Sequence, residues 1–201
     1  MVHSALKFLT QEVNEYLKLR NSVSDNKVVL TNVATQDGGW AIPDNHLGIS
    51  VINIEEERVM KEQQTRVVST AGETSYRNPE IKLNLYLIVT ANYTTQANDT
   101  ESEQYIEGLK QLDYIISFFQ QRNVFTPANS PSMSLIDPNM EKLVVELFSY
   151  SFEQLYNFWS VVGAKYLPSV LYRVRLVRVQ EDLPEYISKA ITEVNIATGK
   201  S

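Results

Sequence analysis

The sequence contains no cysteine and only two histidines, His3 and His46, among its 201 residues. The absence of thiols excludes disulfides, cysteine nucleophiles and thiolate zinc sites, and so few imidazoles leave little material for a histidine-rich metal site. Basic residues are also scarce, with 18 Lys plus Arg against 24 Asp plus Glu and a formal net charge of −6. Because nucleic-acid-binding proteins usually carry a basic excess, we expect no nucleic-acid partner.

Long apolar runs are missing as well. A membrane-spanning helix needs about 18 consecutive apolar residues, and Asn84, Glu146 and Glu153 interrupt the best candidates. We therefore expect no membrane span. The N-terminus lacks the basic and then apolar pattern of a secretory signal, which predicts assembly in the cytoplasm. A composition of 43% hydrophobic and 21% charged residues is typical of a globular protein with a sizeable core.

Three segments predict amphipathic helices, at residues 4–20, 100–122 and 151–163. The third has the most complete start signal, because Ser151 and Gln154 form a capping box, and the glycine at its end suits a helix stop. The apolar stripes expected to face the core are Leu6, Leu9, Val13, Tyr16 and Leu17 in the first helix and Ile106, Leu109, Leu112, Ile116 and Phe119 in the second.

Strand patterns cluster and do not alternate regularly with the helices, which favours an α+β fold with a mainly antiparallel sheet flanked by about three helices. We expect one domain over residues 1–180 and a C-terminal arm over residues 181–201. Residues 55–79 predict either an extended hairpin or a mobile loop, and residues 124–139, which contain three prolines, predict an irregular loop. The strands are expected at residues 28–33, 49–54, 81–89, 143–148 and 169–179.

Few residues suggest catalysis or metal binding. Glu55 and Glu57 fall on one face of a strand, where they could hold a hard cation or share a proton, although a solvated strand end is the favoured interpretation. Asp44 and His46 are a weaker metal hint within a loop, and a serine triad would have to depend on His46. The glycines have no phosphate-loop spacing. We expect no cofactor and no enzymatic activity.

Two further segments point to contacts. Arg173, Arg175 and Arg178 make one strand locally basic, which is typical either of a surface for an acidic protein partner or of a plain solvated face. The helix after Ser151 is rich in aromatics, and their helical spacing favours core packing over a ligand pocket. The aromatic residues concerned are Phe152, Tyr156, Phe158 and Trp159.

Several segments together resemble the cap, or tail-terminator, family of extracellular contractile injection systems, the phage-tail-like particles that some bacteria assemble and release. The segments that carry the resemblance are ALKFLTQEVNEYLKLR at 5–20, KVVLTNV at 27–33, ISVINIEEER at 49–58, NPEIKLNLYLIVTANY at 78–93, LKQLDYIISFFQ at 109–120 and KLVVELFSYSFEQLYNFWSVVGAKYLPSVLYRVR at 142–175. The last is the most specific, through its aromatic order and its glycine and proline positions.

The resemblance implies a structural subunit of a hexameric ring that closes the inner tube and engages the last sheath layer. Its partners would be copies of itself, the tube protein and the sheath protein. The candidate interface residues are Glu55, Glu57, Arg173, Arg175 and Arg178. Two alternatives stay open: a monomeric adaptor or cargo-binding protein of the same particle, and a hydrolase that uses His46 or the glutamate cluster.

Overall fold

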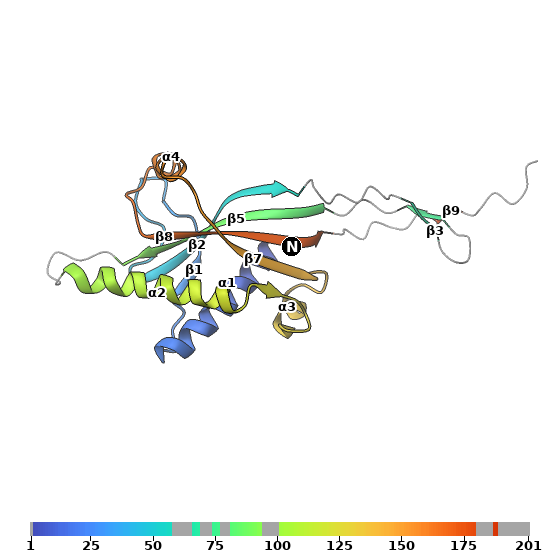
Figure 1. The fold of residues 1–201 in the computed structure, drawn as a ribbon, viewed down its shortest axis with the longest axis horizontal. Coiled ribbons are helices and arrows are strands. Elements are labelled where there is room, and N and C mark those ends of the chain that lie inside the picture. Colours follow the sequence, from blue (N-terminus) through green and yellow to red (C-terminus); the bar gives the residue numbers. More distant parts are fainter. Residues whose placement is uncertain are drawn as a thin grey trace, which may run out of the picture.

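The computed structural model describes residues 2–57, 66–68, 74–76, 81–93, 101–179 and 187–188. Figure 1 shows how its elements are arranged. The helices are α1 (Val2–Asn21), α2 (Glu101–Gln121), α3 (Pro131–Ile136) and α4 (Phe152–Val162). The strands are β1 (Val28–Leu30), β2 (His46–Glu56), β3 (Arg66–Val68), β4 (Thr74–Tyr76), β5 (Ile81–Asn92), β6 (Val124–Phe125), β7 (Lys142–Phe148), β8 (Ser169–Val179) and β9 (Ile187–Ser188).

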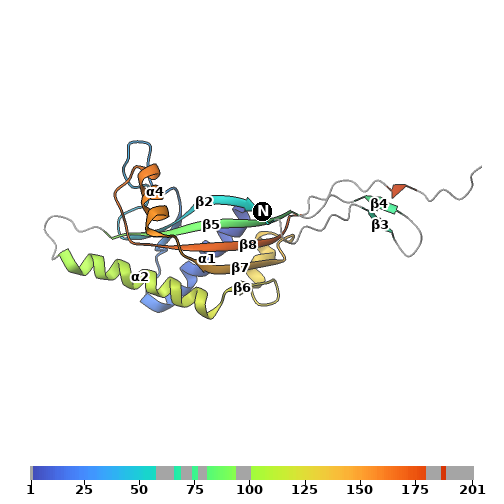
Figure 2. The same cartoon turned by 45° about the horizontal axis from the view of Figure 1, so that its top comes forward.

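Six strands form one sheet in the order β1-β2-β5-β8-β7-β6. β1 pairs with β2 in parallel, and the other neighbouring strands pair antiparallel. Figure 2 shows α1 and α2 on one side of this sheet and α4 on the other. The arrangement confirms the predicted α+β class with a mainly antiparallel sheet, with the short α3 in addition to the three expected helices.

The larger core lies between the sheet and helices α1, α2 and α3. Phe8 of α1 and Phe125 of β6 are fully buried there, with ring centroids 5.5 Å apart in an edge-to-face contact at 80°. Such a contact adds to the free energy of burying the two rings. The central strands contribute alternate residues to this core, namely Leu85, Leu87 and Val89 from β5 and Tyr172, Val174 and Leu176 from β8.

A smaller core lies on the other face, beneath α4. Its buried members are Val33, Ile88, Trp159, Leu167 and Leu171. Ile88 and Leu171 belong to the residues of β5 and β8 that alternate with those of the larger core, since successive side chains of a strand point to opposite faces. The central strands therefore bury side chains on both faces.

One buried polar residue joins α1 to the edge of the sheet. Asn14 donates from Nδ2 to the carbonyl oxygen of Val28 at 2.9 Å and accepts at Oδ1 from the amides of Lys27 and Val28, both at 3.0 Å. A buried amide side chain must find such partners to avoid the cost of desolvation. Here the partners fix the start of β1 against the helix.

The apolar stripe predicted for the second helix was partly wrong. Leu112 and Phe119 are buried as expected, but Ile106 is 58% exposed and Leu109 is also exposed. In Figure 2 the first turns of α2 extend past the end of the sheet, so their apolar side chains have no strand beneath them. At Gly108 the helix packs closely on Tyr93, the residue that follows β5, because a Cβ at position 108 would lie 2.9 Å from Cβ of Tyr93.

The prediction of an irregular loop at residues 124–139 was also wrong. This segment contains strand β6 and helix α3, and both Phe125 and Met133 are completely buried. The three prolines suggested a segment without regular structure, but Pro131 occupies the first turn of α3, where its missing amide hydrogen costs little.

The predicted start and stop of the helix after Ser151 are confirmed. The Ser151 side chain accepts a hydrogen bond from the amide of Gln154, and the Gln154 side chain accepts one from the amide of Ser151. Gly163 ends the helix in the left-handed region, at a φ of 71°. The predicted strand at residues 169–179 coincides with β8.

The described part of residues 55–79 favours the hairpin over the loop. β3 and β4 pair antiparallel, and β9 from the predicted C-terminal arm pairs with β4 to complete a three-stranded sheet. Figure 1 shows this small sheet apart from the six-stranded sheet. The division into a domain over residues 1–180 and an arm over residues 181–201 stays a prediction.

Two leucines of α1 test the position of the larger core. Leu9 is 1% exposed in that core, whereas Leu19 is 83% exposed on the same helix. We expect Leu9→Ala to lower the free energy of unfolding by about 2–5 kcal/mol, because it removes buried methyl groups and leaves a cavity. The matched control Leu19→Ala should change it by less than about 0.5 kcal/mol. Urea denaturation followed by circular dichroism measures both, and equal losses would contradict this placement of the core.

Candidate interaction surface

Helix α4 covers only part of its face of the sheet, and beyond it the face becomes polar. Next to α4, Ile88 of β5 pairs in register with Leu171 of β8, which pairs with Phe148 of β7. Moving two residues along the strands replaces these apolar side chains by polar ones. The first polar row consists of Asn53, Tyr86, Arg173 and Glu146, and the second contains Glu55, Asn84 and Arg175. We call these seven residues the charged rows.

Glu146 is the centre of the charged rows. Its Oε2 accepts hydrogen bonds from Nη2 of Arg173 at 2.6 Å and from Nε of Arg173 at 3.1 Å, and its Oε1 accepts one from Arg175. Hydrogen bonds between charged groups are shorter and stronger than neutral ones. One carboxylate thus serves two guanidinium groups, and Glu55 supplies the second negative charge of the charged rows.

The neighbouring groups shift one another's pKa values. The hydrogen bond from Arg173 holds the pKa of Glu146 below its usual range, with Arg175 acting in the same direction. Partial burial is the largest cause that raises the pKa of the Tyr86 hydroxyl, and a hydrogen bond with Glu55 acts in the same direction. Arg173 opposes this shift. At neutral pH Glu146 is therefore a carboxylate and Tyr86 a neutral phenol.

Aromatic rings connect the charged rows to the region under α4. The rings of Tyr86 and Phe148 have centroids 5.1 Å apart at 71°, and those of Phe148 and Tyr150 lie 5.4 Å apart at 85°. Tyr150 directly precedes the residue that caps α4. Tyr86 of the charged rows is thus packed against an aromatic series that leads to the start of α4.

Glu55 and Glu57 lie at the end of β2 and take part in a local polar network. Glu55 accepts a hydrogen bond from Nδ2 of Asn53 at 2.9 Å, and Glu57 accepts one from Nδ2 of Asn84 at 3.0 Å. Asn84 is the register partner of Glu55, so the two glutamates converge on one face as the alternation predicts. The partners of these two glutamates include the amides of Asn53 and Asn84 and the hydroxyl of Tyr86, and such an arrangement suits a hydrogen-bonded surface.

Of the three predicted interface arginines, Arg173 and Arg175 lie side by side with Glu146, and the side chain of Arg178 lies outside the described residues. Tyr172 is on the opposite face, buried in the larger core, as expected. The basic character of this strand is therefore reduced by one glutamate. The candidate interface of the sequence analysis, which consists of Glu55, Glu57, Arg173, Arg175 and Arg178, stays a prediction.

His46 stands at the start of β2, and its Nδ1 contacts the carbonyl oxygen of Asp44 at 2.8 Å. Within the described ranges, no group of three or more His, Asp or Glu side chains is arranged to hold a metal ion. Among the same residues, no helix is both long and apolar enough to cross a bilayer.

The aromatic residues of α4 divide between the core and the solvent. Trp159 is buried and Phe158 half-buried, as predicted for core packing. Phe152 and Tyr156 are 92% and 73% exposed, so the core interpretation was wrong for these two. The helix lies on a narrow patch of the sheet and buries one side, which leaves its flanks uncovered.

The sequence interpretation missed Glu146 and Tyr86 as members of this surface. In the sequence, Glu146 stands out only as a residue that interrupts an apolar run. The available signal was strand alternation, which places Glu146 on the face opposite Leu143 and Val145 and places Tyr86 opposite Leu85. The register that brings them beside Arg173 depends on strand order, which alternation does not provide.

The pairing of Glu146 gives a pH-dependent prediction. Since its folded-state pKa is depressed, its contribution to stability is present above the ordinary glutamate pKa and is lost as the pH falls through the folded-state pKa. We expect Glu146→Gln to lower the free energy of unfolding by about 1 kcal/mol or less at pH 7. The difference from wild type should shrink as the pH falls below about 4.

Urea titrations at several pH values measure this difference. Glu103→Gln, which removes the charge of an exposed glutamate of α2, is the matched control for the loss of one carboxylate outside the cluster. A wild-type advantage that grows towards acid pH would contradict the assignment.

One protein family and two solved structures are similar to this chain. The model of the Pvc16 N-terminal domain family matches residues 5–193. The sheath/tube terminator of PVC, an extracellular contractile injection system, in its extended state, has a TM-score of 0.55 and 16% identity, over 100% of this chain and 64% of that one. The tube-terminating cap of the anti-feeding prophage has a TM-score of 0.50 and 12% identity, over 94% of this chain and 60% of that one.

This chain thus spans less than two thirds of either solved terminator. No curated protein sequence matches it. The likeness to the two terminators concerns the fold, whereas the family model covers nearly the whole sequence. On that match, the chain belongs to the Pvc16 N-terminal domain family.

Proposed function

We propose that this chain is a structural, non-enzymatic subunit that terminates the inner tube of a contractile injection system and engages the last layer of its sheath. The observation that carries this proposal is the family match over residues 5–193. The shared fold with a sheath/tube terminator and with a tube-terminating cap supports it. In this proposal the protein assembles in the bacterial cytoplasm and becomes part of a particle that is released.

A terminator must match the symmetry of the tube that it closes, so we propose a hexameric ring. A head-to-tail contact between identical subunits generates a closed ring when its rotation permits. Such a role needs surfaces for neighbouring proteins more than it needs a reactive centre. The hydrogen bonds of Glu146 with Arg173 and Arg175, which form a network at the surface, support such a role.

The charged rows are our candidate for the contact with sheath or with a neighbouring subunit. They lie on the part of the sheet face that α4 leaves uncovered, and they combine two arginines with Glu146 and Glu55. Mixed charges of this kind favour selection of a complementary partner and a fast association more than high affinity. Glu57 and Arg178 are included in this candidate interface from the sequence.

Deleting the gene from a strain that produces the particles tests the function. Without a terminator, tube and sheath growth should lose its defined end, so electron micrographs should show particles of variable length or free tubes and sheaths. Complementation with the wild-type gene should restore a single length. Particles of normal and uniform length in the deletion strain would contradict the proposal.

Arg175→Ala tests the candidate interface. This arginine is partly exposed, and Glu146 keeps Arg173 as a partner when it is removed. We expect binding to purified sheath or to capped tubes to weaken by roughly 3- to 10-fold at low salt, and by less as salt rises and screens the charge. Lys7→Ala, on the exposed side of α1, is the control and should bind normally. Equal binding by both variants at low salt would remove the charged rows from the interface.

A further inference from the structure

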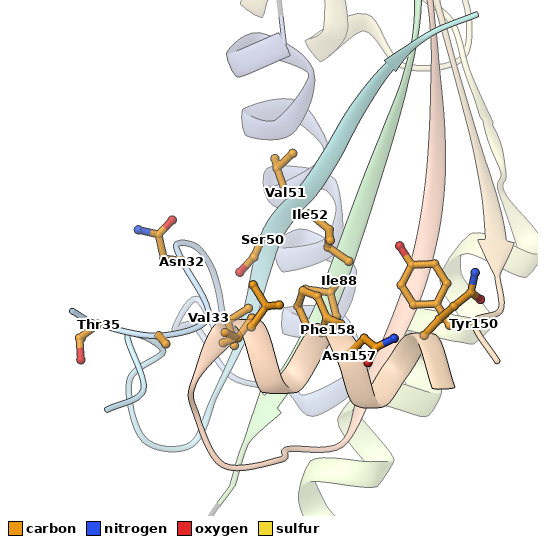
Figure 3. A pocket seen from close by; sticks show the side chains of 14 residues that line it. Asn32, Val33, Thr35, Ser50, Val51, Ile52, Ile88, Tyr150, Asn157 and Phe158 are labelled. Carbon is orange, nitrogen blue, oxygen red and sulfur yellow. The ribbon is translucent and has the colours of Figure 1, made fainter. Parts of the chain in front are cut away.

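A groove lies between α4, strand β2 and the segment that follows β1. Its volume is about 710 Å³, and its lining is mainly apolar. Figure 3 shows Ile88 and Phe158 at its floor, where the sheet and the helix face each other, with Val33 beside them. Asn32 and Asn157 supply polar groups along its rim. An open, largely apolar hollow of this size suits an apolar side chain that is accompanied by a polar group.

The same helix exposes two large aromatic side chains on another flank. Phe152 and Tyr156 are one helical turn apart and are 92% and 73% exposed. We call these two residues the aromatic flank. Close by in sequence, Tyr166 is also exposed and packs its ring on Trp159, with centroids 5.5 Å apart. Neighbouring exposed aromatics are uncommon on a protein surface and often mark a contact site.

The groove and the aromatic flank lie on opposite sides of α4. Each residue of an α-helix advances by about 100° around the axis. Gln154 and Phe158, which line the groove, each follow an aromatic-flank residue by two positions, or about 200°. One helix therefore presents an apolar hollow on one side and apolar rings on the other.

We propose that the groove receives the aromatic flank of a second copy of the chain, so that neighbouring subunits pack head to tail through α4. A symmetric dimer through the aromatic flank would bury the rings but leave the groove empty. The head-to-tail contact buries both the aromatic side chains and the groove. Its repetition gives a closed ring of subunits or an open helical filament, according to the rotation between subunits. This contact rests on the hexameric ring of the proposed function, and it would join neighbouring subunits of that ring.

The contact has both apolar and polar complementarity. The ring of Phe152 matches the apolar floor, and the hydroxyl of Tyr156 can exchange a hydrogen bond with a rim amide such as that of Asn157. Two aromatic side chains bury roughly 300–500 Å² together. A stable interface buries about 800 Å² per partner. The groove contact is therefore one part of a larger interface, and we expect firm association only where the tube end adds further contacts.

The absence of cysteine permits a direct test by cross-linking. Ser160→Cys places a thiol one turn after Tyr156, beside the aromatic flank, and Asn32→Cys places one on the rim of the groove; both positions are exposed. The two variants are mixed, or co-expressed in particles, and treated with a short bis-maleimide. Mass spectrometry then identifies the linked peptides. We expect the mixed pair to cross-link at least tenfold more than either variant alone.

Two controls separate a specific contact from collision and from misfolding. Lys7→Cys on α1, mixed with Asn32→Cys, measures random encounters. Adding Tyr156→Asp to the Ser160→Cys variant should reduce the mixed cross-link to that background, while circular dichroism stays unchanged because Tyr156 is on the surface. Mixed cross-links at background level, both in concentrated protein and in particles, would overturn the inference, as would a product dominated by links between identical variants.

Electron microscopy of the particles separates this outcome from failure of the proposed function. A ring at the tube end without the mixed cross-link would overturn the groove contact and leave the terminator role intact. Uniform particle length after gene deletion would overturn the terminator role, whatever the cross-linking result.

Discussion

The structure depends on the antiparallel pairing of β5 with β8, the two long strands at the centre of the sheet. Each must satisfy two faces at once, because their side chains alternate. One set fills the core against α1 and α2. The other set changes character along the strands, from Ile88 and Leu171 under α4 to Tyr86 and Arg173 beyond it. The boundary between the small core and the charged rows is therefore set within these two strands.

Helix α4 contributes to packing and is also the element of the proposed subunit contact. Its capping box and its left-handed glycine define its two ends, and Trp159 anchors it in the small core. It buries only one side, so one flank borders a groove and the other leaves Phe152 and Tyr156 in solvent. A helix that served stability alone would gain nothing from two exposed aromatic rings. In the head-to-tail contact that we propose, each flank meets a different neighbouring subunit.

Much of the fold could be predicted because local patterns carry strong signals. Alternation located β8 and β5, and the cap residues located α4. The predictions failed where burial depends on what lies opposite. The first turns of α2 have an apolar stripe but extend past the sheet, and the proline-rich segment contains α3, whose Met133 is buried by distant elements. The local sequence does not show where the sheet ends beneath α2 or which distant elements cover Met133.

For the candidate surface, the sequence by itself determined the residue types, the strand faces and the locally basic character of β8. It also limited the chemistry, since a chain without thiols and with two histidines has few reactive groups. Only the tertiary structure decided that Glu146 lies between Arg173 and Arg175 and that a groove forms beside α4. The physical reason is that register and strand order bring together residues that are distant in the sequence. Glu146 and Arg173 are 27 residues apart, and the two sides of the groove, at residues 32–52 and 150–162, are farther apart still. The whole core sets register and strand order, and neither strand sets them alone.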